Sequence, residues 1–361
     1  MTGCLIGEQR QADARRSRTC CRSCLSAIGV LAVAAAAAAA PGAENAKAPA
    51  KELITPAVER SIDSGLKWLV AQQRADGSFG AGANRGNVGV TALAGMAWMA
   101  NGSTPGRGAY GEAVNRCLNH LLGNVRPSGF IFAQDASHGP MYGHGFATMF
   151  LAECYGAARR PELRDKLSKA VRLIVDCQNE EGGWRYQPVR ADADISVTAC
   201  QIVALRAARN AGIFVPSATI DRAIGYVKRC QNGDGGFRYM LPPGKSAFPR
   251  SAAAVVAFYG GGAHESPELG KALPYLMQFL PGTPIKERQS YYFYGQYYAA
   301  QAMWQVGGES WRRWYPAMRD ALIARQRPDG SWQAIEGDEC GTAMACFALQ
   351  VPNDVLPILQ R

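Results

Sequence analysis

Two carboxylates stand close together in the middle of the chain, in the run Asp192-Ala-Asp194-Ile-Ser196. Paired carboxyl groups can divide general acid and base work between them. Asp and Ser also suit a helix start, because their side chains accept hydrogen bonds from the first N–H groups of a helix. Both interpretations predict a helix over Val197–Ala208. Asp194 and Asp192 are therefore candidate catalytic residues, and Ser196 and Thr198 are candidate ligand-binding residues.

Other predicted helix starts carry further groups suited to chemistry. His144, in Tyr142-Gly-His-Gly145, could bind an anionic or polar head group, act as a general acid or base, or be a capped and hydrogen-bonded wall residue. Arg250 and the nearby Lys245 could attract a diphosphate. Aromatic rings crowd residues 291–304, where they would line a cavity or fill the space between helices. The candidate ligand-binding residues from this stretch are Tyr291, Tyr294, Tyr298 and Trp304.

A recurring turn divides the chain into similar units. The turn starts with Gln, has Gly at its fifth residue and ends with Trp or Phe at its seventh. Clear copies begin at Gln73, Gln178, Gln231 and Gln326, and a degraded copy begins at Asn124. The spacing predicts six units, which we expect to stack and to bury one common core.

Each unit is predicted to form a helix, the Gly-containing turn and a second helix. The helix before the turn is amphipathic, as in the unit where Leu167, Val171 and Ile174 share one face. The helix after the turn carries no charged residue in four units: 91–100, 251–262, 291–308 and 342–351. A helix that is apolar all round is buried on every side. The sequence thus predicts an all-α fold, with charged outer helices around a ring of apolar inner helices. We expect each turn Gln to hydrogen-bond backbone groups at neighbouring helix ends.

The Gln-to-aromatic turn resembles the QW repeat of squalene-type triterpene cyclases and of protein prenyltransferase β subunits. The resemblance covers residues 55–361, with prenyltransferase and squalene-oxidase-type repeats. It implies an α/α toroid, or α6/α6 barrel, built from six helix pairs. Such a fold does not by itself define a reaction.

The carboxylate run is similar to the Asp-x-Asp-Asp-Thr motif with which squalene–hopene-type cyclases protonate a terminal alkene. The resemblance implies that Asp194 donates the proton, that Asp192 tunes it, and that His144 and Ser196 orient it. Ile195 stands where the motif has its last Asp, so one supporting carboxylate is absent. The implied ligand is a hydrophobic, isoprenoid-like molecule in a central cavity, where the tyrosines would stabilise cationic character.

We expect no metal and no cofactor. Asp338-Glu-Cys340 resembles part of the zinc site of protein prenyltransferases, but the first unit lacks the His that would complete it. The chain also has no Asp-Asp-x-x-Asp motif for magnesium, which disfavours metal-dependent ionisation of a diphosphate.

The N-terminal residues are typical of a targeting segment. Five arginines precede an apolar run over 25–40, and small residues follow it. We expect residues 1–43 to be a signal peptide, residues 44–54 a short exposed segment, and the protein to be exported to the periplasm or the extracellular space. Retention of an uncleaved tether is the alternative. The run is too short for a stable membrane span, so we expect no transmembrane segment in the mature chain.

Charge disfavours a nucleic-acid-binding protein, and the cysteines define no disulfide framework. The net charge of +10 is spread along the helices, which does not favour nucleic-acid binding. Seven cysteines follow residue 43, an odd number with no short paired spacing, so we assign no disulfide: Cys117, Cys154, Cys177, Cys200, Cys230, Cys340 and Cys346. Cys177 and Cys230 each stand directly before a turn Gln, and we expect these two to fill the core.

The leading hypothesis is an exported protein similar to terpene cyclases or prenyltransferases that binds an isoprenoid-like molecule. If it is catalytic, its chemistry would be that of a cyclising isomerase or lyase, or of a transferase. The alternatives are a non-catalytic binding or scaffold toroid and a polysaccharide-cleaving α/α-barrel enzyme, with Asp192 and Asp194 as the carboxylate pair. Neither the reaction nor a protein partner follows from the sequence.

Overall fold

The computed structural model describes residues 53–80, 85–133, 139–283 and 291–360. The chain forms two units, Met1–Glu44 and Asn45–Arg361, and all described residues belong to the second. The proposed signal peptide and most of the proposed exposed segment lie outside the described residues. Helix α2 begins at Pro56, and the side chain of Thr55 caps its first turn.

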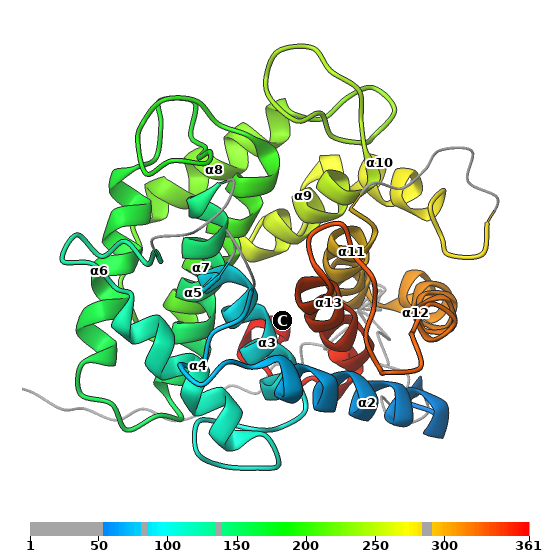
Figure 1. Cartoon of the computed structure of the whole chain (residues 1–361). Coiled ribbons are helices and arrows are strands. Elements are labelled where there is room, and N and C mark those ends of the chain that lie inside the picture. The colour runs from blue at the N-terminus through cyan, green and yellow to red at the C-terminus, as the bar shows by residue number, and fades with distance from the viewer. Residues whose placement is uncertain (1–52, 81–84, 134–138, 284–290, 361) are drawn as a thin grey trace, which may run out of the picture. The chain divides into compact units, whose positions relative to one another are not determined.

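The described residues form twelve α-helices of alternating character (Figure 1). The outer helices are amphipathic: in α6, Leu163, Leu167, Val171 and Ile174 are buried and the charged residues face solvent. The outer set comprises α2 (Pro56–Gln72), α4 (Gly111–Gly123), α6 (Leu163–Asp176), α8 (Ser217–Arg229), α10 (Pro267–Met277) and α12 (Gly308–Ile323). The inner helices are buried on nearly all sides. They are α3 (Val88–Ala100), α5 (Pro140–Tyr155), α7 (Ile195–Asn210), α9 (Phe248–Gly260), α11 (Tyr292–Val306) and α13 (Asp338–Gln350).

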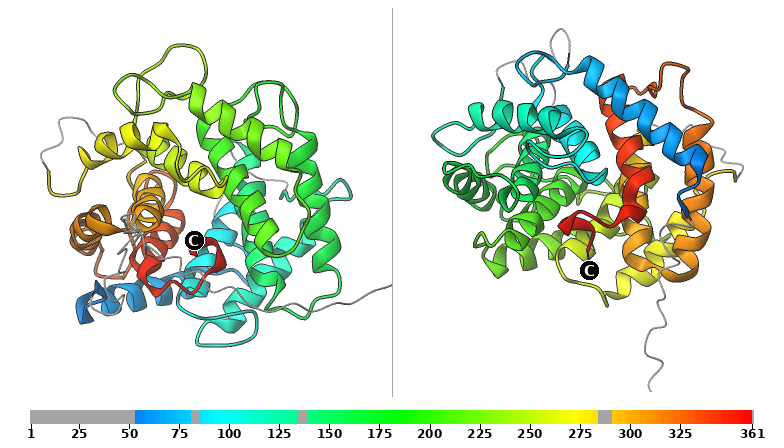
Figure 2. Two further views of the ribbon diagram at one scale, coloured as in Figure 1. Left: turned by 180° about the vertical axis from the view of Figure 1, so that it is seen from behind. Right: turned by 90° about the horizontal axis from the view of Figure 1, so that it is seen from below.

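The inner helices form a closed ring (Figures 1 and 2). Each one packs against the next along the chain, and α13 packs against α3. Gln350 Nε2 donates to the Ala97 carbonyl at 2.9 Å across that closure. The prediction of an all-α toroid with apolar inner helices is therefore confirmed.

The turn glutamines link neighbouring outer helices, as predicted. The Nε2 of Gln178 donates to Gly182 O within its own turn and to Thr219 O at the start of α8, both at 2.8 Å. Gln326 makes the matching bond to Ser61 O in α2 at 2.9 Å, which closes the outer layer. Gly182 has a φ of 94°, and a Cβ there would overlap the Arg222 carbonyl, so the turn requires glycine.

Aromatic rings meet across the axis of the inner ring. Phe146 of α5 and Tyr297 of α11 belong to helices on opposite sides of the ring, and their centroids are 6.2 Å apart in an edge-on arrangement. Phe347 of α13 packs on the same tyrosine at 4.9 Å. These three rings therefore fill the interior at their own level of the ring.

The segment after α13 covers the other end of the ring. It contains two short 3-10 helices, η2 (Val351–Asn353) and η3 (Pro357–Leu359). Ile358 and Leu359 are buried. Gln305 Nε2 of α11 donates to Leu359 O at 3.0 Å, and Arg206 of α7 donates to Gln360 O. This segment therefore joins the ends of inner helices that are not neighbours.

Among the described residues, no helix combines the length and the apolar character that a membrane crossing requires.

Candidate functional site

Asp194 caps α7 and is fully buried. Its backbone is extended, and its N–H donates to Trp184 O at 3.0 Å, which fixes the residue against the repeat turn. Its Oδ1 accepts hydrogen bonds from the N–H groups of Ser196 and Val197, each at 2.9 Å. The helix-cap interpretation of this residue is thus confirmed.

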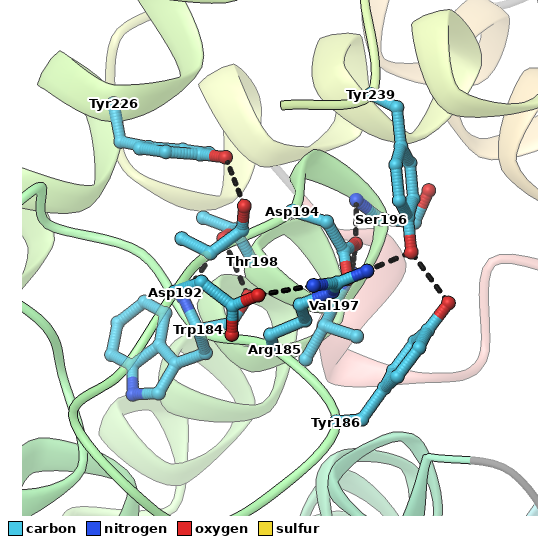
Figure 3. A network of polar contacts seen from close by, with 11 residues as sticks. Trp184, Arg185, Tyr186, Asp192, Asp194, Ser196, Val197, Thr198, Tyr226 and Tyr239 are labelled. Atoms are coloured by element: carbon cyan, nitrogen blue, oxygen red, sulfur yellow. Dashed lines mark hydrogen bonds and ion pairs between the residues drawn. The ribbon is translucent and has the colours of Figure 1, made fainter. Parts of the chain in front are cut away.

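The second carboxylate oxygen of Asp194 faces side chains from two repeats (Figure 3). Tyr239 Oη donates to Oδ2 at 3.1 Å, and the hydroxyls of Tyr239 and Tyr186 are 2.5 Å apart. Arg185 Nε lies 3.9 Å from the same oxygen. Asp194 therefore has one oxygen committed to the helix and one that interacts with a tyrosine pair and a guanidinium.

Burial raises the pKa of Asp194 to about 6, although the hydrogen bonds from Val197 and Tyr239 and the charge of Arg185 act in the opposite direction. A carboxyl group with this pKa is half protonated at about pH 6 and about one-tenth protonated at pH 7. It can serve as an acid, and the three donors around it stabilise the carboxylate that forms when it gives up its proton.

Asp192 is half-exposed and forms an ion pair with Arg185. The Arg185 guanidinium also lies over the Tyr186 ring, with its carbon 5.1 Å from the centroid. Arg185 thus connects the two carboxylates, and Asp192 influences Asp194 through this shared guanidinium.

Tyrosines from two inner helices lie beside the start of α7. Tyr142 of α5 and Tyr294 of α11 both interact with the Ser196 side chain, and both interact electrostatically with Asp194. Burial holds the pKa of each phenol above its usual value. Tyr298 packs on Tyr294 with centroids 4.8 Å apart. The structure therefore brings four predicted residues together: Asp194, Ser196, Tyr294 and Tyr298.

The structure places His144 away from this cluster. Its Nδ1 accepts the Ile131 N–H at 3.1 Å, and its Nε2 faces Ala170 O at 3.2 Å. Burial lowers the pKa of His144 to about 4, so the ring is neutral. Both ring nitrogens are engaged with the backbone of the second repeat turn and of α6, and the contacts give His144 a role in positioning that turn.

Thr198 has the equivalent role in its own repeat. Its Oγ1 accepts the Trp184 N–H at 3.1 Å, and Thr91, Ser251 and Thr342 accept the N–H of Phe79, Phe237 and Trp332 in the same way. His144 is therefore the second repeat's version of a residue that ties each turn to its inner helix. The recurrence of Thr or Ser 10 to 14 residues after the turn aromatic was the sequence signal for this role.

Two predicted aromatic residues also lie apart from Asp194. Tyr291 precedes α11 with a φ of 58° and is 54% exposed. Trp304 is near the other end of α11, where its ring meets Trp311 of α12 edge-on at 5.0 Å. Ten residues of helix separate Trp304 from Tyr294, or about 15 Å.

Arg185, Tyr186 and Tyr239 were not predicted as site residues. The sequence holds a signal for them, because Gly-Gly-Trp184-Arg-Tyr186 and Gly-Gly-Phe237-Arg-Tyr239 are two copies of one extended turn. Each copy places its tyrosine two residues beyond the buried aromatic. Tyr239 also accepts the Ile195 N–H through its carbonyl at 2.9 Å, which holds it over the start of α7.

The residues that resemble a zinc site have other partners. Asp338 forms an ion pair with Arg327 at 2.7 Å. Burial raises the pKa of Cys340 to about 12, which opposes the thiolate form that binds zinc. Within the described ranges, no group of three or more His, Cys, Asp and Glu side chains is arranged to hold a metal ion.

Comparison with known proteins defines the class. Residues 50–242, more than half of the chain, match the prenyltransferase alpha-alpha toroid domain family. This chain therefore belongs to the prenyltransferase alpha-alpha toroid domain family.

A curated relative and several solved structures give the comparison more detail. A drimenyl diphosphate synthase of Streptomyces showdoensis is 28% identical over 173 residues, which are 47% of this chain and only 31% of that protein. A type II terpene cyclase from Scytonema, solved with its substrate geranylgeranyl dihydroxybenzoate, has a TM-score of 0.61 at 17% identity and covers 83% of this chain and 98% of its own. A cellobiose 2-epimerase from Spirochaeta thermophila has a TM-score of 0.60 at 12% identity, with coverage of 83% and 98%. These structural likenesses establish the fold.

Proposed function

We propose that this protein is an acid-initiated cyclase that binds an isoprenoid at the end of the ring where the inner helices begin, with Asp194 as the proton donor. The observation that carries this proposal is the environment of Asp194. It is a buried carboxyl group of raised pKa with one oxygen turned toward a tyrosine hydroxyl and with further tyrosines beside it.

In the proposed reaction, protonated Asp194 gives its proton to a terminal alkene carbon of the ligand. The remaining alkene carbon becomes cationic, and a second alkene of the same chain attacks it to close a ring. The tyrosine faces of α5 and α11 would stabilise the positive charge. Loss of a proton, or addition of water, would end the reaction. The Asp194 carboxylate keeps its bonds to Ser196 N and Val197 N, which limits the cost of its ionisation.

Asp194 must regain its proton after each turnover. The Tyr186–Tyr239 pair offers a path, since the two hydroxyls and Asp194 Oδ2 follow one another at 2.5 and 3.1 Å. Rotation of the two O–H groups would move a proton along this chain. In this proposal Arg185 and Tyr239 supply the polar support for Asp194, and Ile195 takes the position of the absent carboxylate.

The relatives support the proposal through their ligands. The Scytonema enzyme of the same fold binds a geranylgeranyl compound, and the Streptomyces relative is named for a terpene diphosphate. We leave His144, Thr198 and Trp304 out of the reacting site because of the contacts described above. Asp192 stays in it as the partner of Arg185.

A non-catalytic toroid is the second candidate function. Two observations favour it: Asp194 satisfies two backbone N–H groups as a cap, and Phe146 meets Tyr297 across the axis of the ring. In that case the buried aspartate would hold the start of α7 and would do no chemistry.

Substitution of Asp194 separates the two candidates. Asn is as good a helix cap as Asp, so Asp194→Asn keeps the two backbone bonds and removes the acid. We expect the mature protein to convert a polyprenyl substrate, such as squalene or farnesyl diphosphate, to cyclic products detectable by mass spectrometry. Asp194→Asn should abolish these products and leave the free energy of unfolding within about 1 kcal/mol.

The matched control is Asp192→Asn, which removes the half-exposed carboxylate and leaves Asp194 in place. We expect it to lower the rate and to retain the product. The cyclase proposal fails if the wild-type protein forms no cyclic product, or if Asp194→Asn forms it at the wild-type rate.

Export belongs to the same proposal and rests on the N-terminal sequence. We infer that residues 1–43 direct the protein out of the cytoplasm. Amino-terminal sequencing of protein from the native host should find a start between residues 41 and 44, and a start at Met1 in cytoplasmic protein contradicts the inference.

A further inference from the structure

Arg250 is a half-buried cation with one nitrogen that the described residues do not satisfy. It lies in the first turn of α9, and its buried Nε has no hydrogen-bond partner among the described residues. Its guanidinium carbon lies 5.7 Å from the centroid of the Tyr239 ring. Arg185 faces the same ring at 6.0 Å, but Arg185 is paired with Asp192. The two arginines thus differ in direct pairing: Arg185 has a carboxylate within ion-pair distance, and Arg250 has none among the described residues.

Burial without a partner is unfavourable for a guanidinium. It lowers the pKa of Arg250, while Tyr275, Tyr239 and Asp194 act electrostatically in the opposite direction. The tyrosine ring holds the guanidinium in place through a cation–π contact, which leaves the N–H groups of the guanidinium edge for another acceptor. The start of α9 adds partial positive charge at the same point. An anionic group is the chemical complement of this arrangement.

A planar guanidinium matches the geometry of two anions in particular. Diphosphate and carboxylate oxygens can each accept two parallel N–H bonds from one Arg. We propose that Arg250, stacked on Tyr239, binds the anionic head group of a short prenyl ligand, either a diphosphate or a carboxylate. The inference rests on the proposed function for the prenyl part of the ligand, but the anion site stands on Arg250 itself.

The position of Tyr239 limits the size of this ligand. The face of Tyr239 contacts Arg250, and its hydroxyl contacts Asp194, so a single phenol separates the anion site from the proposed acid. A ligand that reaches both groups must fold until its head and its terminal alkene approach one another. A prenyl chain of about three isoprene units can fold in this way, whereas an extended and uncharged chain makes no use of Arg250.

Calorimetric titration of the full protein with four probes tests the proposal. The probes are farnesyl diphosphate, farnesoic acid, farnesol and inorganic diphosphate. We expect wild-type protein to bind at least one of the two anionic prenyl probes at least tenfold more tightly than farnesol, and the comparison between them identifies the preferred head group. Arg250→Gln should remove that preference and leave farnesol affinity within twofold. Arg250→Lys keeps the charge and loses the planar fork, so it should recover only part of the affinity.

The matched control is Lys245→Gln, which removes one positive charge from an exposed side chain of the loop before α9. It should change no affinity by more than twofold, and thermal unfolding of each variant verifies that it is folded.

The proposal is overturned if Arg250→Gln and wild type bind the anionic probes equally, or if wild type binds none of them. If farnesol binds and no anionic probe depends on Arg250, the prenyl site stands without the head-group site. If inorganic diphosphate binds through Arg250 and no farnesyl compound binds, the anion site stands and a short prenyl ligand is contradicted.

Discussion

The buried charged groups at the two ends of the helical ring have different hydrogen-bond partners. Where the inner helices begin, Asp194 keeps one oxygen for side chains, and Arg250 has an unsatisfied Nε. Where they finish, Arg206 donates to the carbonyls of Tyr259 and Gln360, and the segment after α13 packs its apolar residues inward. The arginine of α9 at the first end therefore keeps an unpartnered Nε among the described residues, whereas the arginine of α7 at the second end donates to peptide carbonyls.

The two ends differ in the acceptors that their arginines face. Peptide carbonyls of the chain itself are the acceptors at the second end, so its arginine needs no external partner. At the first end, the Arg250 guanidinium faces the Tyr239 ring instead of a peptide carbonyl. We therefore assign ligand recognition to the end that contains Asp194 and structural closure to the other.

The largest expected effect is on stability, through the segment after α13 that covers the second end of the ring. Leu359 is 1% exposed, and Leu359→Ala should lower the free energy of unfolding by about 2–5 kcal/mol because it leaves a cavity beneath η3. Denaturant unfolding measures the loss. Val355→Ala, at a position 46% exposed in the same segment, is the control and should change stability by less than about 0.5 kcal/mol. Equal effects of the two would mean that this segment does not close the ring.

The next effect concerns pH. Burial raises the pKa of Glu153 to about 7 from 4.5, against the opposing Ile358 backbone N–H and Arg206. The folded protein therefore holds this proton more tightly than the unfolded chain, and stability decreases as pH rises from about 4.5 to 7. Glu153→Gln should remove this decrease. Between pH 4 and pH 8, the free energy of unfolding of the variant should therefore rise relative to that of wild type by about 1–3 kcal/mol. Parallel stability–pH curves for the two proteins would show that Glu153 does not titrate in this way.

A smaller effect distinguishes a turn-positioning histidine from a catalytic one. Because Thr occupies the equivalent position in three other repeats, His144→Thr should retain the helix and lose about 1–2 kcal/mol from incompletely replaced hydrogen bonds. Binding of prenyl probes and any cyclase rate should remain within about twofold of wild type, since His144 faces Ile131 and Ala170. Loss of turnover with unchanged stability would instead return His144 to the reacting site.

The smallest effect reports on the Asp194 environment. The Tyr239 hydroxyl lowers the pKa of Asp194, so Tyr239→Phe should raise that pKa above about 6 and cost about 1 kcal/mol of stability. The descending limb of the pH–rate profile should move to higher pH. Tyr186→Phe removes only the outer hydroxyl and should move the limb less. A profile that stays fixed in both variants would exclude Asp194 as the titrating acid.

Much of the fold was predictable because its cause repeats along the sequence. A Gln, a Gly and an aromatic ring at fixed spacing specify the same turn in four clear copies, and the charge-free stretches identify the inner helices. The cap on α7 was also predictable, because it depends on Asp194 and Ser196, which are close together in the sequence. Cys177 and Cys230 are buried, as predicted from their repeat position; that all seven described cysteines are unpaired and buried did not follow from the sequence.

The composition of the site was less predictable because it joins different repeats. The sequence drew attention to His144 for its chemistry, yet its repeat position gives it the same task as Thr198. Arg185 and Tyr239 went unnoticed, since one belongs to the turn before α7 and the other to the turn before α9. Their meeting at Asp194 depends on how neighbouring helix pairs pack.

The sequence by itself determined the helix pairs, their inner and outer faces and the aspartate at the start of α7, because each of these follows from residues close together in the chain. Only the tertiary structure decided which side chains face Asp194, that rings from α5 and α11 meet across the axis, and that Arg250 stacks on Tyr239. Those contacts bring together residues from different repeats, and their distances are set by helix packing and ring closure, which no local pattern specifies.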